Sequence, residues 1–251
     1  MQVVELGGQD LAQVAGSVPF VRWGLGLEGV ARAWRGPGSV AFERYRRAYG
    51  TSLTVIGDPE AAADVAARLA PRLDVGSVTL PRAAVVPPHV PFGPPDAGTG
   101  WEWMWTDTEP DPSPGEDRVV ELDADSAAVR AELGAFLAEH SPRHSAEPDD
   151  ELARAWLGVR TPDGDLVACL ALYEAVPGVD LMASVAVAAQ ARGQGLGLAI
   201  TAAATRRMLR EHPPVATVDL YSDNDAARAL YRRLGYRLDQ EFTSYPLRRA
   251  A

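Results

Sequence analysis

A glycine-rich turn between an apolar run and a helical stretch is the part of the sequence best suited to chemistry. Residues 181–187 are apolar and indicate a strand, and the turn that follows contains Arg192-Gly193-Gln194-Gly195-Leu196-Gly197. A turn that opens a helix leaves backbone N–H groups without partners at the positive end of the helix dipole. Glycines allow phosphate oxygens to approach that backbone closely. The stretch 181–211 is therefore predicted to bind a phosphorylated cofactor.

The composition is that of an ordinary soluble protein. The chain has 251 residues, of which 47% are hydrophobic and 23% are charged, and it is long enough for one large domain or two small ones. It has no apolar run long enough for a transmembrane helix, and its first residues do not form a signal peptide. We therefore expect a cytoplasmic protein without a membrane partner. The single Cys169 lies in an apolar run and cannot form an internal disulfide.

The charge of the chain argues against a nucleic-acid partner. The formal net charge is -10, and all 24 basic residues are arginine. An acidic protein suits a neutral or cationic small substrate. The four histidines are too scattered for metal-ligand spacing, so we expect neither a structural nor a catalytic metal. These are His89, His140, His144 and His212.

The N-terminal half of the sequence gives few signals. Glycines and a proline interrupt the apolar residues of segment 11–34, which predicts irregular structure with at most one short helix. A helix is predicted at 59–70, because Asp58 suits the N-cap and Pro59 the first helical position. The proline-rich stretch 87–100 should be a loop. Strands are predicted at 39–42, 52–56 and 78–86.

Three tryptophans alternate along the next predicted strand. Trp101, Trp103 and Trp105 have the period of two that places side chains on one face. Such a stripe either lines an acceptor pocket or packs at a domain seam, and packing is the commoner outcome. The polar, proline-rich segment 109–115 that follows is the best candidate for a domain boundary. It divides the chain into an N-terminal accessory domain, 1–115, and a C-terminal domain, 116–251.

The C-terminal domain has a regular succession of predicted elements. Before the strand at 181–187 come a strand at 119–122, helices at 125–140 and 149–155, and strands at 156–160 and 166–174. After the glycine turn and its helix come a strand at 215–221, a helix at 224–234, and strands at 236–238 and 242–247. Three antiparallel strands before a β-α-β crossover predict an α/β (α+β) fold with a mixed, mostly antiparallel central sheet flanked by helices.

Two other nucleotide-binding folds fit the glycine turn less well. The Rossmann pattern Gly-x-Gly-x-x-Gly fails because Leu198 stands where the third glycine should be. The predicted hairpins upstream also do not suit a doubly wound parallel sheet. A P-loop needs a lysine after its second glycine, and the chain contains no lysine.

Two motifs at the expected separation resemble the GNAT superfamily of acyl-CoA-dependent N-acyltransferases. The first is Val187-x4-Arg192-Gly193-x-Gly195-x-Gly197, and the second is Asn224-x2-Ala227-x2-Leu230-Tyr231-x2-Leu234-Gly235-Tyr236. The resemblance covers residues 118–248 and implies the GNAT fold for them. Ala189 stands where the family often has proline, which affects the stiffness of the turn and not the chemistry. The N-terminal α/β domain is either a degenerate copy of the same fold without the glycine turn, or an added module that shapes the substrate site or forms a homodimer.

The resemblance also implies acetyl-CoA as the acyl donor. The N–H groups of the turn would hold the pyrophosphate, and the edge of the preceding strand would bind the pantetheine arm. In this family that strand separates from its neighbour at a bulge, which opens a slot for the arm. The implied cofactor-binding residues are Val185, Ala186, Val187, Arg192, Gly193, Gln194, Gly195, Leu196, Gly197, Leu198, Asn224, Ala227 and Tyr231.

Catalytic roles can be assigned to two of these residues from the resemblance. The N–H of Val187 would stabilise the oxyanion, and Tyr231 would be the general acid that protonates the leaving thiolate. Tyr231 could instead simply pack its helix onto the sheet. The general base stays open between three carboxylates, Glu174, Asp180 and Asp219, with Glu174 ranked first.

The predicted reaction is direct transfer of an acetyl group to a primary amine of a small molecule or a peptide, in a ternary complex. One alternative is a non-catalytic acyl-CoA-binding or regulatory module, because no general base stands out. The other is an NAD(P)-binding oxidoreductase, which requires nicotinamide nucleotides to bind better than CoA.

Overall fold

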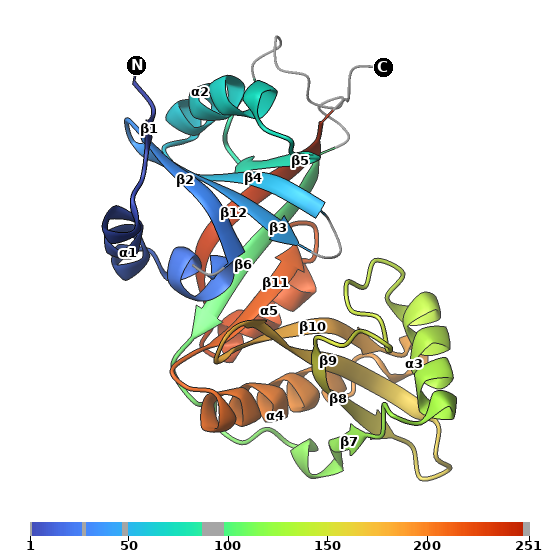
Figure 1. Cartoon of the computed structure of the whole chain (residues 1–251). Helices are drawn as coiled ribbons and strands as arrows, with labels where there is room; N and C mark the ends of the chain where they lie inside the picture. Colours follow the sequence, from blue (N-terminus) through green and yellow to red (C-terminus); the bar gives the residue numbers. More distant parts are fainter. Residues whose placement is uncertain (1, 27–28, 47–49, 87–97, 248–251) are drawn as a thin grey trace. The chain divides into compact units, whose positions relative to one another are not determined.

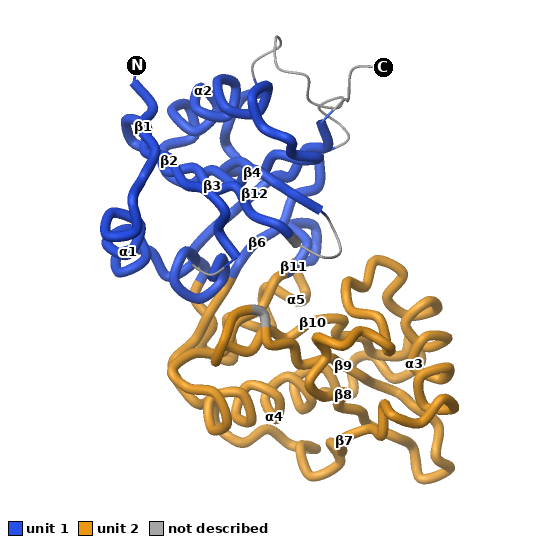
Figure 2. Tube along the Cα trace, viewed as in Figure 1, with its two compact units in different colours: residues 1–103, 220–224, 238–251 blue, residues 104–219, 225–237 orange. Residues whose placement is uncertain are grey.

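The chain forms two compact units in the computed structural model, which describes residues 2–26, 29–46, 50–86 and 98–247 (Figures 1 and 2). Unit 1 comprises Met1–Trp103, Leu220–Asn224 and Leu238–Ala251, and unit 2 comprises Met104–Asp219 and Asp225–Arg237. Compared with the predicted division at residue 116, unit 2 begins earlier, and the last strand of the chain belongs to unit 1 from Leu238 onward. Most of the loop predicted at 87–100 lies outside the described residues.

Unit 2 is built on strands in the order β11-β10-β9-β8-β7. Neighbouring strands are antiparallel except for β10 and β11, which are parallel because a helix crosses between them. The mixed, mostly antiparallel sheet flanked by helices is therefore confirmed. The elements are β7 (Val120–Leu122), α3 (Ala127–His140), β8 (Ala153–Arg160), β9 (Leu166–Val176), β10 (Val179–Val187), α4 (Leu196–Glu211), β11 (Ala216–Tyr221) and α5 (Asp225–Arg233).

The core of unit 2 forms where strands and helices cover each other. Residues 166–172 of β9 are all buried, which explains why this strand is a continuous apolar run rather than an alternating one. Helix α3 adds Leu133 and Leu137 to the buried set, and α4 adds Ile200 and Met208. The apolar faces of both helices are thereby removed from water, which is the main stabilising contribution to such a unit.

Unit 1 is built on strands in the order β1-β2-β3-β4-β5-β12-β6. Helix α2 covers one face of these strands and buries Ala62 and Val65 in a core with Leu53 and Val78. The Asp58 side chain accepts the N–H of Ala61 at 2.9 Å, so the predicted N-cap of α2 is confirmed. The elements are β1 (Val4–Glu5), α1 (Gly8–Ser17), the helical turn η1 (Phe20–Leu25), β2 (Val30–Gly36), β3 (Ser39–Arg46), β4 (Gly50–Gly57), α2 (Pro59–Leu69), β5 (Ser77–Pro81), β6 (Thr99–Thr106) and β12 (Arg237–Pro246).

Trp101 and Trp103 lie in an aromatic cluster of unit 1. The ring of Phe20 lies 6.3 Å from Trp101 and 5.5 Å from Trp103, and Phe242 lies 4.7 Å from Trp101. These centroid distances are typical of packed aromatic pairs. Trp105 belongs to unit 2, where the guanidinium of Arg237 lies 3.9 Å from the centre of its ring.

The two units share one succession of strands and helix. In each, three antiparallel strands lead through a helix to a strand parallel to the third, as β2-β3-β4-α2-β5 and as β8-β9-β10-α4-β11. The linking turns differ in length, because α2 begins two residues after the end of β4, whereas α4 begins nine residues after the end of β10. We therefore favour, as a proposal, that unit 1 is a degenerate copy of the fold of unit 2 that lacks the glycine turn.

Several predicted segments differ from the structure, among them the strand predicted at 78–86, which ends at Pro81 as β5. The helix predicted at 149–155 is a turn followed by the start of β8, because the Asp150 side chain accepts the N–H of Leu152 at 3.0 Å and closes a local turn. The segment 11–34 contains most of α1, η1 and the start of β2. Its Gly24 lies within η1 and not in a loop. A glycine is needed there because an added Cβ would lie 2.8 Å from the Trp103 ring.

The two strands predicted at the C-terminus are the single strand β12. Its pairing with β5 continues past Phe242, where the N–H of Arg82 donates to the carbonyl of Glu241 at 2.9 Å. Within the described ranges, no helix is both long enough and apolar enough to cross a membrane.

Candidate active site

A bulge interrupts β10 near its C-terminal end. The register with β9 passes from the pair Ala183–Ala171 to the pair Ala186–Cys169, so two residues of β10 stand opposite one residue of β9. Pairing between β10 and β11 ends at Met182–Val218. Beyond this point the two parallel strands separate, as the family resemblance implies.

The N–H of Val187 faces the open side of β10. Val187 stands opposite Ala168 of β9, and the next residue, Ala188, donates its N–H to the carbonyl of Val167 at 2.9 Å. In an antiparallel ladder this pattern makes Val187–Ala168 a pair that is not hydrogen-bonded, so the N–H of Val187 points away from β9. It therefore points to the side that β11 leaves unpaired, where it can donate to a bound carbonyl oxygen.

The glycine-rich turn presents backbone donors at the start of α4. Gly193 and Gly195 have φ angles of 77° and 79°, and an added Cβ would meet nothing within 4 Å at either residue. They are needed for a left-handed backbone, and they leave the surface of the turn open. The first bond inside α4 joins the N–H of Ala199 to the carbonyl of Gly195 at 3.0 Å. The N–H groups of 196–198 therefore have no acceptor within the helix, and they suit a phosphate group.

The end of β10, the start of α4 and α5 converge at Gly197. A Cβ added to Gly197 would lie 3.4 Å from Leu230 of α5 and 3.7 Å from the side chain of Val187. The turn is held by Arg192, whose Nε donates to the carbonyl of Val187 at 3.3 Å, and by Gln194, whose side chain donates to a carbonyl within the turn. Residues of the two sequence motifs therefore meet in unit 2.

Tyr231 follows Leu230 on α5 and is only 4% exposed. Burial raises the pKa of its hydroxyl well above its ordinary value, so the phenol is protonated at neutral pH. Its ring lies 5.6 Å from that of Tyr236, whose hydroxyl is hydrogen-bonded to Thr205 of α4 at 2.9 Å. Tyr231 therefore packs α5 into unit 2 and also retains a proton that it can donate.

The other predicted cofactor-binding residues are distributed over the same segments. Val185 and Ala186 lie in and after the bulge, directly before Val187. Ala227 lies on α5, whereas Asn224 immediately precedes this helix and belongs to unit 1. Their binding roles remain predictions.

A comparison with known protein families identifies the chain. The model of the acetyltransferase (GNAT) family matches residues 102–236, which is more than half of the sequence. The chain belongs to the GNAT acetyltransferase family. The comparison with curated proteins finds no match.

Solved structures of GNAT proteins have a similar fold over almost the whole chain. A GCN5-related N-acetyltransferase from Kribbella flavida is 20% identical with a TM-score of 0.53, and the match covers 96% of each chain. A GCN5-related N-acetyltransferase from Sphaerobacter thermophilus is 16% identical with a TM-score of 0.56 over 97% of this chain and 94% of that one. An acetyltransferase of the GNAT family from Colwellia psychrerythraea is 12% identical with a TM-score of 0.55, and covers 99% and 100%.

The GNAT fold implies use of an acyl-CoA, and the turn at the start of α4 fits such a ligand. The free N–H groups of 196–198 and the open surface at Gly193 and Gly195 match the needs of a pyrophosphate. In the part of the chain that the structure describes, no group of three or more His, Cys, Asp and Glu side chains is placed to hold a metal ion.

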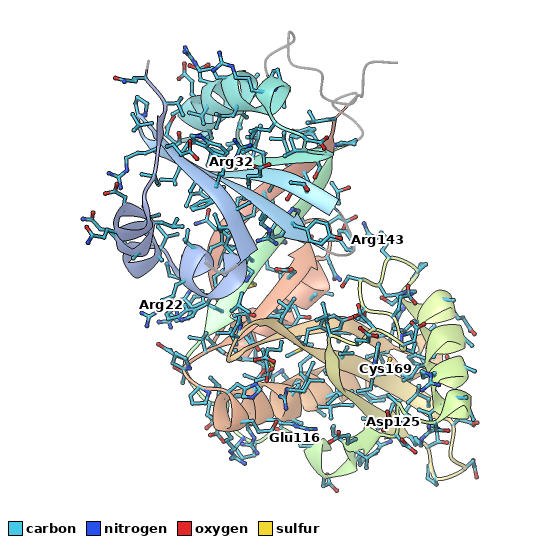
Figure 3. The ribbon with its side chains drawn as sticks, viewed as in Figure 1. Arg22, Arg32, Glu116, Asp125, Arg143 and Cys169 are labelled. Carbon is cyan, nitrogen blue, oxygen red and sulfur yellow. The ribbon has the colours of Figure 1, made fainter. Side chains whose placement is uncertain are left out.

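Cys169 of this GNAT protein is not placed to act as a nucleophile. It is fully buried on β9, and Figure 3 labels it within unit 2. Burial raises the pKa of its thiol to about 12, so the reactive thiolate does not form at neutral pH. The chain has no other cysteine. A route through an acetylated cysteine is therefore disfavoured.

The structure does not bring Glu174 to the site of this GNAT fold. Glu174 is exposed near the end of β9, where its Oε1 accepts the N–H of Gly178 in the following turn at 2.8 Å. Its partner in the ladder is Asp180, seven residues before Val187, which corresponds to roughly 20 Å along a strand. To act as general base, Glu174 would have to receive the proton of the amine over this distance. Its role remains a prediction.

Asp180 is fully buried in an ion-pair cluster. Arg154 of β8 contacts both of its carboxylate oxygens, at 3.2 and 2.5 Å, and Nδ1 of His212 lies 3.1 Å from one of them. Arg154 also pairs with Glu211 at the end of α4. A buried carboxylate with this many partners fixes the start of β10 to β8 and to α4.

Proposed function

We propose that this protein is an acetyl-CoA-dependent N-acetyltransferase that transfers the acetyl group directly to a primary amine. The observation that carries the proposal is the convergence of three groups within unit 2: the Val187 N–H, the donors at the start of α4, and the α5 segment that carries Tyr231. Bound acetyl-CoA supplies the acetyl group as an activated thioester. The acceptor is a small-molecule or peptide amine, and the net charge of -10 favours a cationic one.

Different residues of the chain bind acetyl-CoA, stabilise the developing charge and donate a proton. The N–H groups of 193–198 hold the pyrophosphate, and the open edge of 185–187 binds the pantetheine arm. The Val187 N–H donates to the carbonyl oxygen as negative charge develops there, an effect that is typically worth about 100- to 1,000-fold in rate. The Tyr231 hydroxyl donates its proton to the departing sulfur.

We propose Asp219 as the general base that takes the proton of the amine. Asp180 is occupied by Arg154 and His212, and Glu174 lies at the hairpin end of β9. Asp219 directly follows Val218, the last residue of β11 that pairs with β10. Asp219 is one residue beyond the pair Met182–Val218, whereas Asp180 pairs with Ala216, so the register places Asp219 nearer to Val187 along the sheet than Asp180.

Exchanging Asp219 for asparagine should lower kcat/KM for the amine by about 100-fold, because the acceptor ammonium then loses its general base. The loss should shrink at alkaline pH, where more of the amine is already unprotonated. Initial rates of thiol release over a range of pH measure both effects. The matched control is Glu174→Gln, which should stay within about twofold of the wild type. A larger loss in Glu174→Gln than in Asp219→Asn would restore Glu174 as the base.

Acetyl-CoA should stabilise the protein against thermal unfolding more than NAD(P) does. A ligand at 100 times its Kd adds about 2.7 kcal/mol to the free energy of unfolding. Thermal shifts with acetyl-CoA, longer acyl-CoAs and NAD(P), followed by thiol release with a broad amine panel, test the proposal. Stabilisation by acetyl-CoA without thiol release would indicate the non-catalytic binding module. Stronger stabilisation by NAD(P) would contradict the CoA site itself.

A further inference from the structure

A cavity of about 500 Å³ lies in unit 1, between β1, β2 and the end of α2. Its lining comes from the start of the chain, from β2 and from segment 68–73, which includes the helical turn η3 (Ala70–Arg72) that follows α2. All of these residues belong to unit 1. Ligand pockets commonly have volumes of about 300–1,000 Å³, so the cavity is large enough for a small organic molecule.

Part of the lining is apolar. Trp34 of β2 and Leu69 of α2 line the cavity, and both belong to the buried core of unit 1. Val3 and Leu73 also line it, and they are partly buried against the same core. Side chains of this kind bind a hydrocarbon or aromatic group by removing it from water.

The polar part of the lining carries more positive than negative charge. It contains Arg32, Arg68 and Arg72 and one acidic residue, Glu5. Arg32 pairs with Glu43 of β3 at 2.7 Å, so three positive charges stand against two negative ones even when this partner is included. Arg68, in the last turn of α2, also offsets the negative end of the helix dipole. Arg72 has no hydrogen bond or ion pair within the described part of the chain, and it is exposed.

The matching elements of unit 2 are joined by ion pairs instead. There β7, β8 and α4 correspond to β1, β2 and α2. Arg207 of α4 pairs with Glu121 of β7 at 2.7 Å and with Glu211 at 2.9 Å, and Arg154 of β8 also pairs with Glu211. Carboxylates of the protein itself thus neutralise the arginines of unit 2 at this place. In unit 1 the end of α2 supplies arginines, so a carboxylate or phosphate from outside the chain can take that position.

We infer that the cavity binds a small organic anion, whose carboxylate or phosphate group is held by Arg72 and Arg32 and whose apolar part contacts Leu69. Guanidinium groups present paired N–H donors that match the oxygens of both anions. Arg32, labelled in Figure 3, is already positioned by Glu43 and by the ring of Trp34, whose centre lies 5.2 Å from the guanidinium. Little further ordering is therefore needed on binding. The inference does not rest on the proposed function, because the site uses no residue of unit 2.

Titration calorimetry of the full-length protein with phenyl phosphate and with benzoate, in the presence of saturating acetyl-CoA, tests this site. At least one of these two anions should bind. Inorganic phosphate lacks the apolar part and benzyl alcohol lacks the charge, so each should bind about tenfold or more weakly than its counterpart. Tighter binding of phenyl phosphate would assign the site to phosphate groups, and tighter binding of benzoate would assign it to carboxylates.

Arg72→Ala should weaken binding of that anion about tenfold, because charge-assisted hydrogen bonds are lost, and Arg72→Glu should abolish it. Neither variant removes a contact within the described part of the protein. The matched control is Arg35→Ala, which removes the same charge from an exposed position of β2 outside the cavity. It should change the affinity less than twofold.

Four results would overturn the inference. The wild type could bind neither anion, or it could bind them only when acetyl-CoA is left out, which would place them at the glycine turn. Inorganic phosphate or benzyl alcohol could bind as tightly as its counterpart, which would remove either the apolar or the charged part of the site. Equal losses in Arg72→Ala and Arg35→Ala would show an effect of net charge alone.

Discussion

Replacing Tyr231 with phenylalanine should lower kcat by about 100-fold or more and leave KM for acetyl-CoA within about twofold. The substitution removes one buried hydroxyl from α5 and keeps the ring that packs against Tyr236. Only the proton donation to the departing sulfur should be lost. Thiol release at saturating amine measures the change.

The pKa of Tyr231 gives this prediction a pH dependence. Burial raises the pKa above its ordinary value of 10, so the hydroxyl keeps its proton through the neutral and moderately alkaline range. Deprotonation of Tyr231 should therefore not lower the wild-type rate at any pH below 10. A decline near neutral pH, present in the wild type and absent in Tyr231→Phe, would contradict a raised pKa.

Tyr236→Phe is the matched control for this substitution. Tyr236 is also buried, and it loses a hydrogen bond to Thr205 when its hydroxyl is removed. This should cost about 1 kcal/mol of stability without affecting turnover. If Tyr236→Phe impaired kcat as strongly as Tyr231→Phe, or if Tyr231→Phe retained full activity, Tyr231 would be a packing residue only.

The elements that could be predicted from the sequence are those with strong local signals. Helix α2 begins where Asp58 and Pro59 predict it, and the strand–turn–helix around Gly195 is present because apolar runs and glycines determine it locally. The helix predicted at 149–155 is wrong because side chains of this segment bond elsewhere. Asp150 accepts the hydroxyl of Tyr173 at 2.7 Å as well as a local N–H, and such bonds compete with a helix.

The parts of the site that could not be predicted depend on partners distant in the sequence. Ser184 in the bulge of β10 is a polar residue within an apolar strand, which is a weak signal, and its hydrogen-bond partner Ala146 lies 38 residues away. The direction of the Val187 N–H likewise follows only from the pairing of β10 with β9. Glu174 is different, because the tight turn before β10 already places it opposite Asp180 and far from the glycine turn. Its position could have been read from the sequence.

Exchanging Gly195 for alanine should raise the Kd of acetyl-CoA by about tenfold or more. Gly195 has a φ of 79°, and an alanine there costs about 1–2 kcal/mol in a left-handed conformation. The added methyl group would also project from the turn into the open surface where the pyrophosphate is expected, since no protein atom lies within 4 Å of it. Titration calorimetry with acetyl-CoA measures the loss of affinity.

Gly178→Ala separates the effect on the ligand from the effect on the backbone. Gly178 has a φ of 72°, an added Cβ there also meets nothing within 4 Å, and it lies in the β9–β10 turn of the same unit. Both variants should lose similar stability in denaturant, but only Gly195→Ala should lose affinity for acetyl-CoA. S-acetyl-pantetheine, which lacks the pyrophosphate, should bind Gly195→Ala and the wild type equally well. A loss of affinity for both donors would mean that Gly195 shapes the whole cleft, and the assignment of the turn to the pyrophosphate would be wrong.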